Sequence, residues 1–430
     1  MTTRLDLDRT LAEWFRADAG EALPDYLDEL VDRVAREPQR RWWSSPERWL
    51  PVDVTARAST FALPRYGRLA IVALLILAIA AAAVFAVGSR NQRVPPPFGP
   101  AANGSIVSWS QSGDIIAADA DGSNSRIIVG GPSFDFAPWF SHDGTRFIFW
   151  REPTAGQDLV MVANADGSGV RALTDTLLYA DWFEWSPADD AIAVVHTQAG
   201  TGKRLLSIVD ATGKAPLHTL DLPLGVDNDV YWLPPNGDEL LFTARDKPED
   251  PENGLYAVKR DGTAFRQVAP VASSHYNNLA VALDGQRIAF SNVEADSSGN
   301  GIGWHIHLRD LATGSDTQVT FDPRADGEVD EHEPIFSPDG TQLLLWTQTG
   351  DTGRLAVAPS DGTSHARSLG PPFLWDDEYS YAFSPDGRTA ILNIGKGTTW
   401  LFDLESGKGT RLSEGIPNFA SWQRLAQPLP

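Results

Sequence analysis

Hydrophobic side chains follow two different patterns along the chain, and the change comes near residue 100. Before that point a run of nineteen residues without a polar side chain, Leu69–Val87, follows a mostly polar segment. A helix over this run would be about 28 Å long, which suits the hydrocarbon core of a bilayer. We therefore predict one transmembrane helix over residues 67–89. A buried core helix would have a polar face, and a signal peptide would lie closer to the N-terminus.

After residue 100 the apolar segments are short and recur at regular intervals. Segments such as RFIFW (146–150) and QLLLW (342–346) follow turn signals of the type FSPDG. A second turn signal, of the type ADADG, recurs with its glycine at positions 122, 167, 213, 262, 314, 362 and 407. Asp and Gly in such places are typical of tight hairpin turns. Each repeat therefore predicts four antiparallel strands, which make one blade of a β-propeller.

The repeats predict a closed ring of seven blades. Their residues are 104–130, 134–175, 178–221, 225–270, 274–321, 330–370 and 378–413. The first repeat lacks its opening strand, and a matching segment, PNFASWQR (417–424), stands near the C-terminus. We predict that this segment completes the first blade, with Trp422 packed between blades, because closure removes the free edges of an open array. The predicted fold class is an all-β, seven-bladed propeller over residues 104–424.

The FSPDG turns and the DG-T/S turns resemble the repeats of TolB-type propellers, which are relatives of the WD-type propellers. The resemblance covers residues 104–424, about three quarters of the chain. It implies a scaffold for contacts with a protein or a ligand, since such repeats generally carry no catalytic residues of their own. We therefore expect a binding module without a cofactor, and not an enzyme.

Residues 1–66 predict a small helical head. Residues 4–18 and a segment that begins at Pro24 each place apolar side chains on one helical face. Both helices are too short to be stable alone, so they would pack on each other, on a partner or on the bilayer. Residues 40–51 hold three Trp and three Arg, which suits a membrane interface or a partner pocket. Residues 90–103 contain VPPPFGP and predict a stiff linker.

Arginines on the two sides of the apolar run indicate its orientation. Four lie on its N-terminal side (positions 48, 57, 65 and 68) and two on its C-terminal side (90 and 93). This bias predicts a single-pass protein of the cell membrane, with a cytoplasmic N-terminus and an extracytoplasmic propeller. The layout resembles that of membrane-bound anti-sigma factors of bacteria, which implies a sigma factor as the partner of the head. The zinc motif of many such heads is absent, because the chain has no Cys.

Acidic charge is concentrated in the predicted propeller. Residues 1–100 hold 13 basic and 12 acidic side chains, whereas the remainder holds 22 basic and 45 acidic ones. Such an acidic body repels phosphate backbones, so we expect no nucleic-acid partner. The lack of Cys also excludes disulfides and cysteine nucleophiles.

Three motifs could carry chemistry, but a structural role fits each better. The serines of the FSPDG-type turns lack a nucleophile elbow. These serines are Ser186, Ser337 and Ser384. His305 and His307 alternate on a predicted strand without an obvious third metal ligand, so we interpret them as a surface strand pair. The acidic run 322–334 lacks the ligand spacing of a calcium loop and is interpreted as a solvated loop.

Acidic residues recur in the loops that lead into the innermost strands. Alignment of the repeats places them around one mouth of the central channel. They are Asp135, Asp181, Asp227, Asp229, Glu331, Glu333 and Glu378. A concave mouth focuses the field of such charges and would favour a small cation or a basic protein partner. The alternative is that the mouth is only hydrated surface.

Together these features predict a membrane-anchored, extracytoplasmic propeller that acts as a binding or sensor module and relays to an anti-sigma-like head. The alternative function is a scaffold or assembly protein of the cell envelope, whose N-terminal segment only anchors it. A sigma-factor gene next to the gene of this protein would favour the first.

Overall fold

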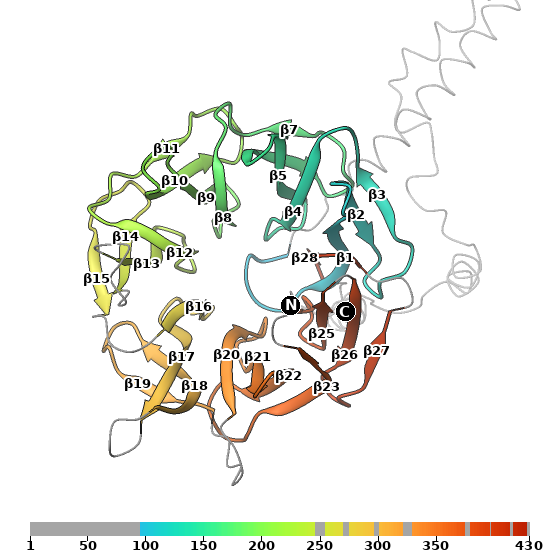
Figure 1. Ribbon diagram of the computed structural model, residues 1–430, viewed down its shortest axis with the longest axis vertical. Helices are drawn as coiled ribbons and strands as arrows, with labels where there is room; N and C mark the ends of the chain where they lie inside the picture. The colour runs from blue at the N-terminus through green and yellow to red at the C-terminus, as the bar shows by residue number, and fades with distance from the viewer. Residues whose placement is uncertain are drawn as a thin grey trace, which may run out of the picture. The chain divides into compact units, whose positions relative to one another are not determined.

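The computed structural model describes residues 95–245, 254–269, 275–295, 301–320, 329–374, 379–395, 397–412 and 416–427. Within these ranges the strands form seven four-stranded antiparallel sheets. Figure 1 shows these sheets arranged as blades in a ring. The predicted all-β, seven-bladed propeller is therefore confirmed. The predicted head (1–66) and transmembrane helix (67–89) lie outside the described residues, and none of the described residues forms a helix that could cross a membrane.

The first four blades follow the chain from the innermost strand to the outermost, except that blade 1 takes its innermost strand from the C-terminus. Blade 1 contains β28 (Phe419–Leu425), β1 (Ala102–Trp109), β2 (Ile115–Ala118) and β3 (Arg126–Val129). Blade 2 contains β4 (Phe134–Phe140), β5 (Arg146–Thr154), β6 (Gln157–Asn164) and β7 (Arg171–Ala172). Blade 3 contains β8 (Tyr179–Trp185), β9 (Ala191–Thr197), β10 (Arg204–Asp210) and β11 (His218–Thr219). Blade 4 contains β12 (Gly225–Trp232), β13 (Glu239–Arg245), β14 (Gly254–Lys259) and β15 (Arg266–Ala269).

The last three blades keep the same order. Blade 5 contains β16 (His275–Val281), β17 (Arg287–Ala295), β18 (Gly301–Asp310) and β19 (Asp316–Gln318). Blade 6 contains β20 (Asp330–Phe336), β21 (Gln342–Thr349), β22 (Thr352–Pro359) and β23 (Arg367–Leu374). Blade 7 contains β24 (Tyr379–Phe383), β25 (Thr389–Ile394), β26 (Thr398–Asp403) and β27 (Gly409–Arg411).

The C-terminal strand closes the ring, as the sequence predicted. β28 pairs with β1 so that Trp422 stands opposite Ile106. The side-chain amide of Gln423 donates a 2.7 Å hydrogen bond to the carbonyl of Gly144, which ties blade 1 to the first turn of blade 2. A Cβ on Gly144 would lie 1.9 Å from the carbonyl oxygen of Arg424, so only glycine permits this approach. The closing strand is therefore held by both of its neighbours.

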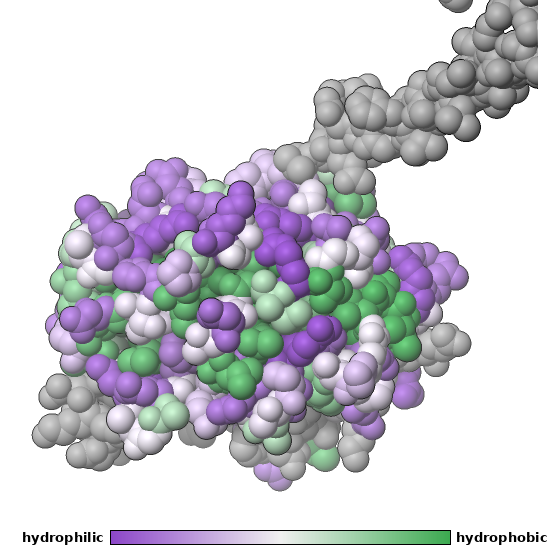
Figure 2. All heavy atoms as spheres, turned by 90° about the horizontal axis from the view of Figure 1, so that it is seen from above, coloured by the Kyte–Doolittle hydropathy of each residue, from purple (hydrophilic) through white to green (hydrophobic). Residues whose placement is uncertain are grey.

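The hydrophobic core is divided among the junctions between neighbouring blades. Seven buried clusters each combine side chains from two adjacent blades. Because both faces of a blade are covered, second strands such as β5 are apolar almost without interruption. Figure 2 shows apolar side chains along the middle of the side wall and polar ones above and below them. The cluster between blades 7 and 1 is small, and Trp422 is its one buried aromatic residue.

The innermost strands all begin on one face of the propeller, which we call the mouth face. They end on the opposite face, the turn face, which carries the FSPDG-type and ADADG-type turns. The N-terminal linker reaches the propeller on the turn face, where the backbone N–H of Ala101 donates to the carbonyl of Pro385 at 2.8 Å. Arg424 donates to the carbonyls of Pro96 and Gly99 at 2.9 and 2.8 Å, and the ring of Phe98 packs edge-on against His142. Residues 96–101 are thus fixed to the propeller.

We predict that Trp422→Ala lowers the free energy of unfolding by about 3–5 kcal/mol, because it empties a small cluster that joins the two ends of the ring. Leu425→Ala, on the same strand but 40% exposed, is the matched control and should cost less than about 1 kcal/mol. Denaturant titration of the two variants and the parent measures both effects. Equal losses would show that the cluster does not hold the ring closed.

Candidate functional site

Six of the seven predicted acidic residues lie at the mouth face, in the first part of an innermost strand. They are Asp135 in β4, Asp181 in β8, Asp227 and Asp229 in β12, and Glu331 and Glu333 in β20. The strands begin earlier than the sequence indicated, so these residues belong to the strands and not to the loops before them. Glu378 lies outside the described residues.

In blade 2 the acidic residue is fully paired. Asp135 is 1% exposed and accepts hydrogen bonds from Arg151 Nε and Nη2, both at 2.7 Å. The two residues stand directly opposite each other on β4 and β5. A planar guanidinium matches a carboxylate in this two-pronged geometry, which compensates the burial of the charge. Asp135 therefore stabilises the wall of the mouth.

In blades 3 and 4 one arginine joins two of the predicted residues. Arg204 Nη2 lies 3.5 Å from Asp181 Oδ1, and Arg204 Nη1 donates a hydrogen bond to the backbone carbonyl of Asp227. Asp181 also accepts a 2.8 Å hydrogen bond from the hydroxyl of Thr197. The aspartate side chain keeps partial exposure, so it can still contribute to the field at the mouth.

In blade 6 a histidine takes the place of arginine. Glu331 is 1% exposed, and its Oε2 lies 2.9 Å from Nδ1 of His305, which belongs to blade 5. His305 and His307 were predicted as a surface pair, and this prediction is wrong because both side chains are largely buried. The ring of His307 instead packs near Phe290, at a centroid distance of 6.0 Å. Among the described residues no group of three potential ligands could hold a metal ion.

Glu333 contacts two tyrosines of blade 7. The hydroxyl of Tyr381 donates a hydrogen bond to the Glu333 carbonyl. Burial, and then the charge of Glu333, raises the pKa of Tyr379 far above its ordinary value. Burial and the same glutamate raise the pKa of Tyr381 as well. Both phenols therefore stay protonated at neutral pH and can act as hydrogen-bond donors.

Aromatic side chains that the sequence analysis did not single out also belong to the innermost strands. Trp139 of β4 is 44% exposed and Trp182 of β8 is 38% exposed, although most large apolar residues of the propeller are buried. Phe134 and Tyr179, at the starts of the same two strands, are exposed as well. Alternation along β4, where Trp139 stands between buried neighbours, could have revealed this surface. Blades 2 and 3 thus offer aromatic contact area next to partly exposed acid.

The serines of the FSPDG-type turns have the structural role that the sequence suggested. Ser337 Oγ donates to Asp339 at 2.6 Å and accepts the backbone N–H of Gln342. Ser384 repeats this arrangement with Asp386. These hydroxyls close turns. The acidic run 322–334 lies partly outside the described residues, and its described part opens β20.

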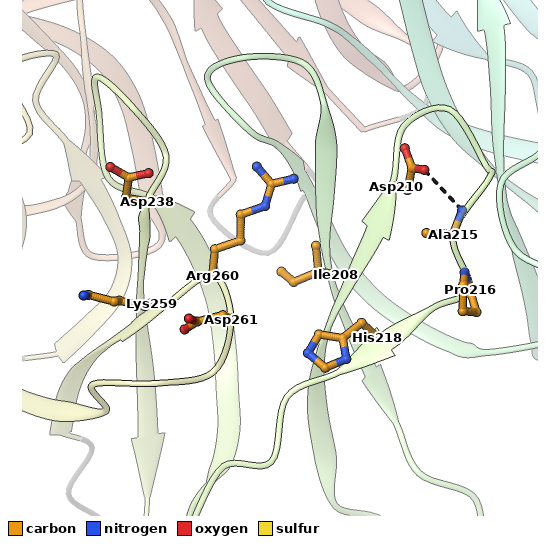
Figure 3. A pocket seen from close by; sticks show the side chains of 9 residues that line it. All are labelled: Ile208, Asp210, Ala215, Pro216, His218, Asp238, Lys259, Arg260 and Asp261. Atoms are coloured by element: carbon orange, nitrogen blue, oxygen red, sulfur yellow. Dashed lines mark hydrogen bonds between the residues drawn. The ribbon is translucent and has the colours of Figure 1, made fainter.

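A cleft of about 680 Å³ lies on the turn face between blades 3 and 4, and Figure 3 shows its lining. Basic and acidic side chains alternate there. They are His218, Lys259, Arg260, Asp210, Asp238 and Asp261. Arg260 is bonded to Asp190 at 2.8 and 3.0 Å, and Asp210 caps its own turn. Since Arg260 and Asp210 serve internal bonds, we take the mouth face as the candidate site.

Asp158, at the start of β6, is a buried acidic residue that the sequence analysis missed. It is 6% exposed at the junction of blades 2 and 3, and its Oδ1 has no hydrogen-bond partner among the described residues. Burial raises the pKa of Asp158 to about 6, Glu152 adds to the increase, and the backbone N–H of Ala180 opposes it. A carboxyl group in this position titrates in a range where ordinary surface carboxylates do not.

We predict that Asp158→Asn stabilises the protein above pH 6. The folded-state pKa of Asp158 is raised. Its carboxyl group therefore costs the parent no stability below the unfolded pKa near 4, and this cost grows as the pH rises to about 6. After allowance for solvent screening, the variant should gain about 1–2 kcal/mol at pH 7.5 and almost nothing at pH 4. Denaturant titrations at both pH values measure this. Asp175→Asn, an exposed position, is the control, and a gain that is equal at both pH values would contradict the prediction.

Residues 102–371 match the family model described as PD40, TolB beta propeller domain. No curated protein matches the sequence of this chain. Solved structures share the fold at low sequence identity. The propeller domain of the Trilobed protease from Pyrococcus furiosus aligns with a TM-score of 0.51 at 11% identity, over 74% of this chain and 99% of that one. That domain is described as having an open velcro topology, whereas β28 closes the ring here.

Two other solved structures have similar folds. A structure from a study of two prolyl endopeptidases aligns with a TM-score of 0.51 at 12% identity, over 73% of this chain and 50% of that one. TolB from Acinetobacter baumannii aligns with a TM-score of 0.43 at 15% identity, over 74% and 82%. These likenesses concern the fold alone, so function must be argued from the site.

Proposed function

The chain belongs to the TolB β-propeller domain family, and from this premise we propose that it is a non-catalytic, membrane-anchored binding module. The propeller binds a protein partner outside the cytoplasm through its mouth face. The apolar run 69–87 anchors it, and the head in residues 1–66 lies in the cytoplasm. The buried carboxylates Asp135 and Glu331 of the mouth are engaged in structural pairs, and no metal-binding group accompanies them in the described residues.

The observation that carries this proposal is the place where the chain enters the propeller. Arg424 and the turn of blade 7 fix residues 96–101 on the turn face. The mouth face is on the opposite side of the propeller, so residues 96–101 do not cover it. Of the two faces, the mouth face carries the partly exposed Asp181 and the exposed aromatic side chains Phe134 and Tyr179 at the starts of β4 and β8.

The composition of this surface suits a basic partner. Phe134 and Tyr179 offer ring faces on which Lys or Arg side chains can lie. Residues 101–430 hold 23 more acidic than basic side chains, and this excess attracts a basic surface. Ion pairs without net charge, such as Asp135–Arg151, reduce the negative electrostatic field in blade 2. The attraction therefore depends on the whole face and not on one ring of charges.

We expect the double substitution Phe134→Ser and Tyr179→Ser to reduce partner capture at least tenfold, because exposed aromatic residues dominate protein interfaces. Ile127→Ser, which is 60% exposed on the outermost strand β3, is the control and should leave capture unchanged. Full-length tagged protein, crosslinked in cells and isolated at several salt concentrations, gives the measurement. Undiminished capture by the double variant at every salt concentration would place the binding surface elsewhere.

The proposed topology has its own test. Protease added to intact cells, or to spheroplasts where an outer barrier exists, should remove the propeller and leave a fragment of about 100 residues, because the linker precedes the described domain. A tag at the N-terminus should remain protected. Complete protection of the propeller would reverse the proposed orientation.

We also propose that the head relays binding to a sigma factor, on the strength of the overall layout. Full-length protein should then retain a sigma factor that a chain without residues 1–66 does not retain. If both forms retain the same proteins, the head serves as an anchor and the envelope-scaffold alternative is favoured.

A further inference from the structure

Blades 2 and 6 bury a carboxylate at the same structural position. Asp135 and Glu331 each stand three residues before a proline in the innermost strand. In both strands the residue directly before this proline has a left-handed backbone conformation, with φ of 51° at Ala137 and 52° at Glu333. Both carboxylates are 1% exposed. Within one molecule the repeat therefore provides two copies of the same environment.

The partners of the two carboxylates differ in kind. Asp135 stands opposite Arg151 on the neighbouring strand and is bonded to it. The residue opposite Glu331 is Thr347, which carries no charge. His305 supplies the partner instead, and it comes from the neighbouring blade, with Nδ1 2.9 Å from Oε2. In blade 2 the pair lies within one sheet, whereas in blade 6 it joins two blades.

The chemistry of the two partners differs in the same way. A guanidinium stays charged at every pH at which proteins fold, whereas an imidazole gains or loses its charge near pH 6.5. With a protonated His305, Glu331 forms an ion pair across the junction. With a neutral His305, the buried carboxylate keeps only a neutral donor, and an uncompensated buried charge is unfavourable.

We infer that the junction of blades 5 and 6 is a pH-responsive joint in the wall of the mouth, closed by the His305–Glu331 ion pair and loosened when His305 loses its proton. The inference concerns the propeller alone and does not depend on the partner proposed above. The pair stabilises the junction while His305 is protonated, and this contribution is lost as the pH rises, which is the sign expected for a histidine paired with a carboxylate.

A series of aromatic and histidine side chains links blades 5, 6 and 7 next to this joint. The ring centroid of Trp304 in blade 5 lies 5.9 Å from that of His332 in blade 6, and the centroid of His332 lies 4.9 Å from that of Trp346. Trp346 in turn lies 5.4 Å from Tyr379 of blade 7. Loosening at His305 would therefore change packing at the mouth across three blades.

Other titratable side chains lie on the same two strands as the pair. They are Asp330, His332 and Glu333 on β20 and His307 on β18. Asp330 accepts the backbone N–H of Trp304 at 2.9 Å and so also joins the two blades. His332 is a second histidine next to the pair in the sequence of β20, so the experiment must separate the two. A His305→Gln variant does this, because it keeps every other group and retains a side-chain donor for Glu331.

The test is hydrogen exchange of the full-length protein at pH 6 and pH 8, corrected for intrinsic exchange rates. In the parent we expect the backbone amides of residues 330–336 to lose protection about three- to tenfold at pH 8. Residues 134–140, where arginine is the partner, are the internal control and should not respond. In His305→Gln the response of residues 330–336 should disappear. A response that persists in the variant, or that is equal in both segments, would overturn the inference.

A second variant keeps the test decisive if His305→Gln does not fold. The double substitution Thr347→Arg and His305→Ser gives blade 6 the arrangement of blade 2. It should remove the pH response of residues 330–336 and leave their protection at pH 8 close to that of the parent at pH 6. Retention of the pH response in this variant would assign it to His332 and contradict the inference.

Discussion

Every blade of this propeller has two apolar faces, and neither can be buried without a neighbour. A four-stranded sheet covered on one side only would expose strands such as β5 or β21, which are apolar over most of their length. The ring must therefore close, and closure depends on the last strand of the chain. Trp422, Gln423 and Arg424 meet this constraint together, because they fill the junction with blade 7, bond to blade 2 and hold the linker.

Closure also creates the electrostatic problem of the mouth. The innermost strands converge there, so polar residues at their starts lose water and need partners. Three acidic residues meet this requirement in different ways. Asp135 pairs with Arg151 of its own sheet, and Asp181 pairs with Arg204, which also bonds to the next blade. Glu331 pairs with His305 of the preceding blade. The surface that remains for a partner combines partial acid exposure with aromatic rings, which differs from a simple ring of negative charge.

The sequence predicted the blades closely and the site only in part. Regular glycine turns and apolar strands are local signals, so the blade boundaries and the closing strand could be read from them. The acidic positions followed from the same alignment. Their partners did not, because Arg151 and His305 stand 16 and 26 residues away from the carboxylates they pair with, and nothing local marks the contact. The burial of Asp158 was equally invisible, since an aspartate at a strand start normally faces water.

Repetition explains how such differences can arise without loss of the fold. Backbone geometry at Asp135 and Glu331 is the same, down to the left-handed residue two places later, so the blade tolerates either solution. What changes is the chemistry across the junction, from a permanent charge inside one sheet to a titratable one between two sheets. Because each junction is held largely by its own cluster of side chains, a change at one of them alters that part of the mouth first. A propeller can in this way keep its fold while the chemistry of a single junction changes.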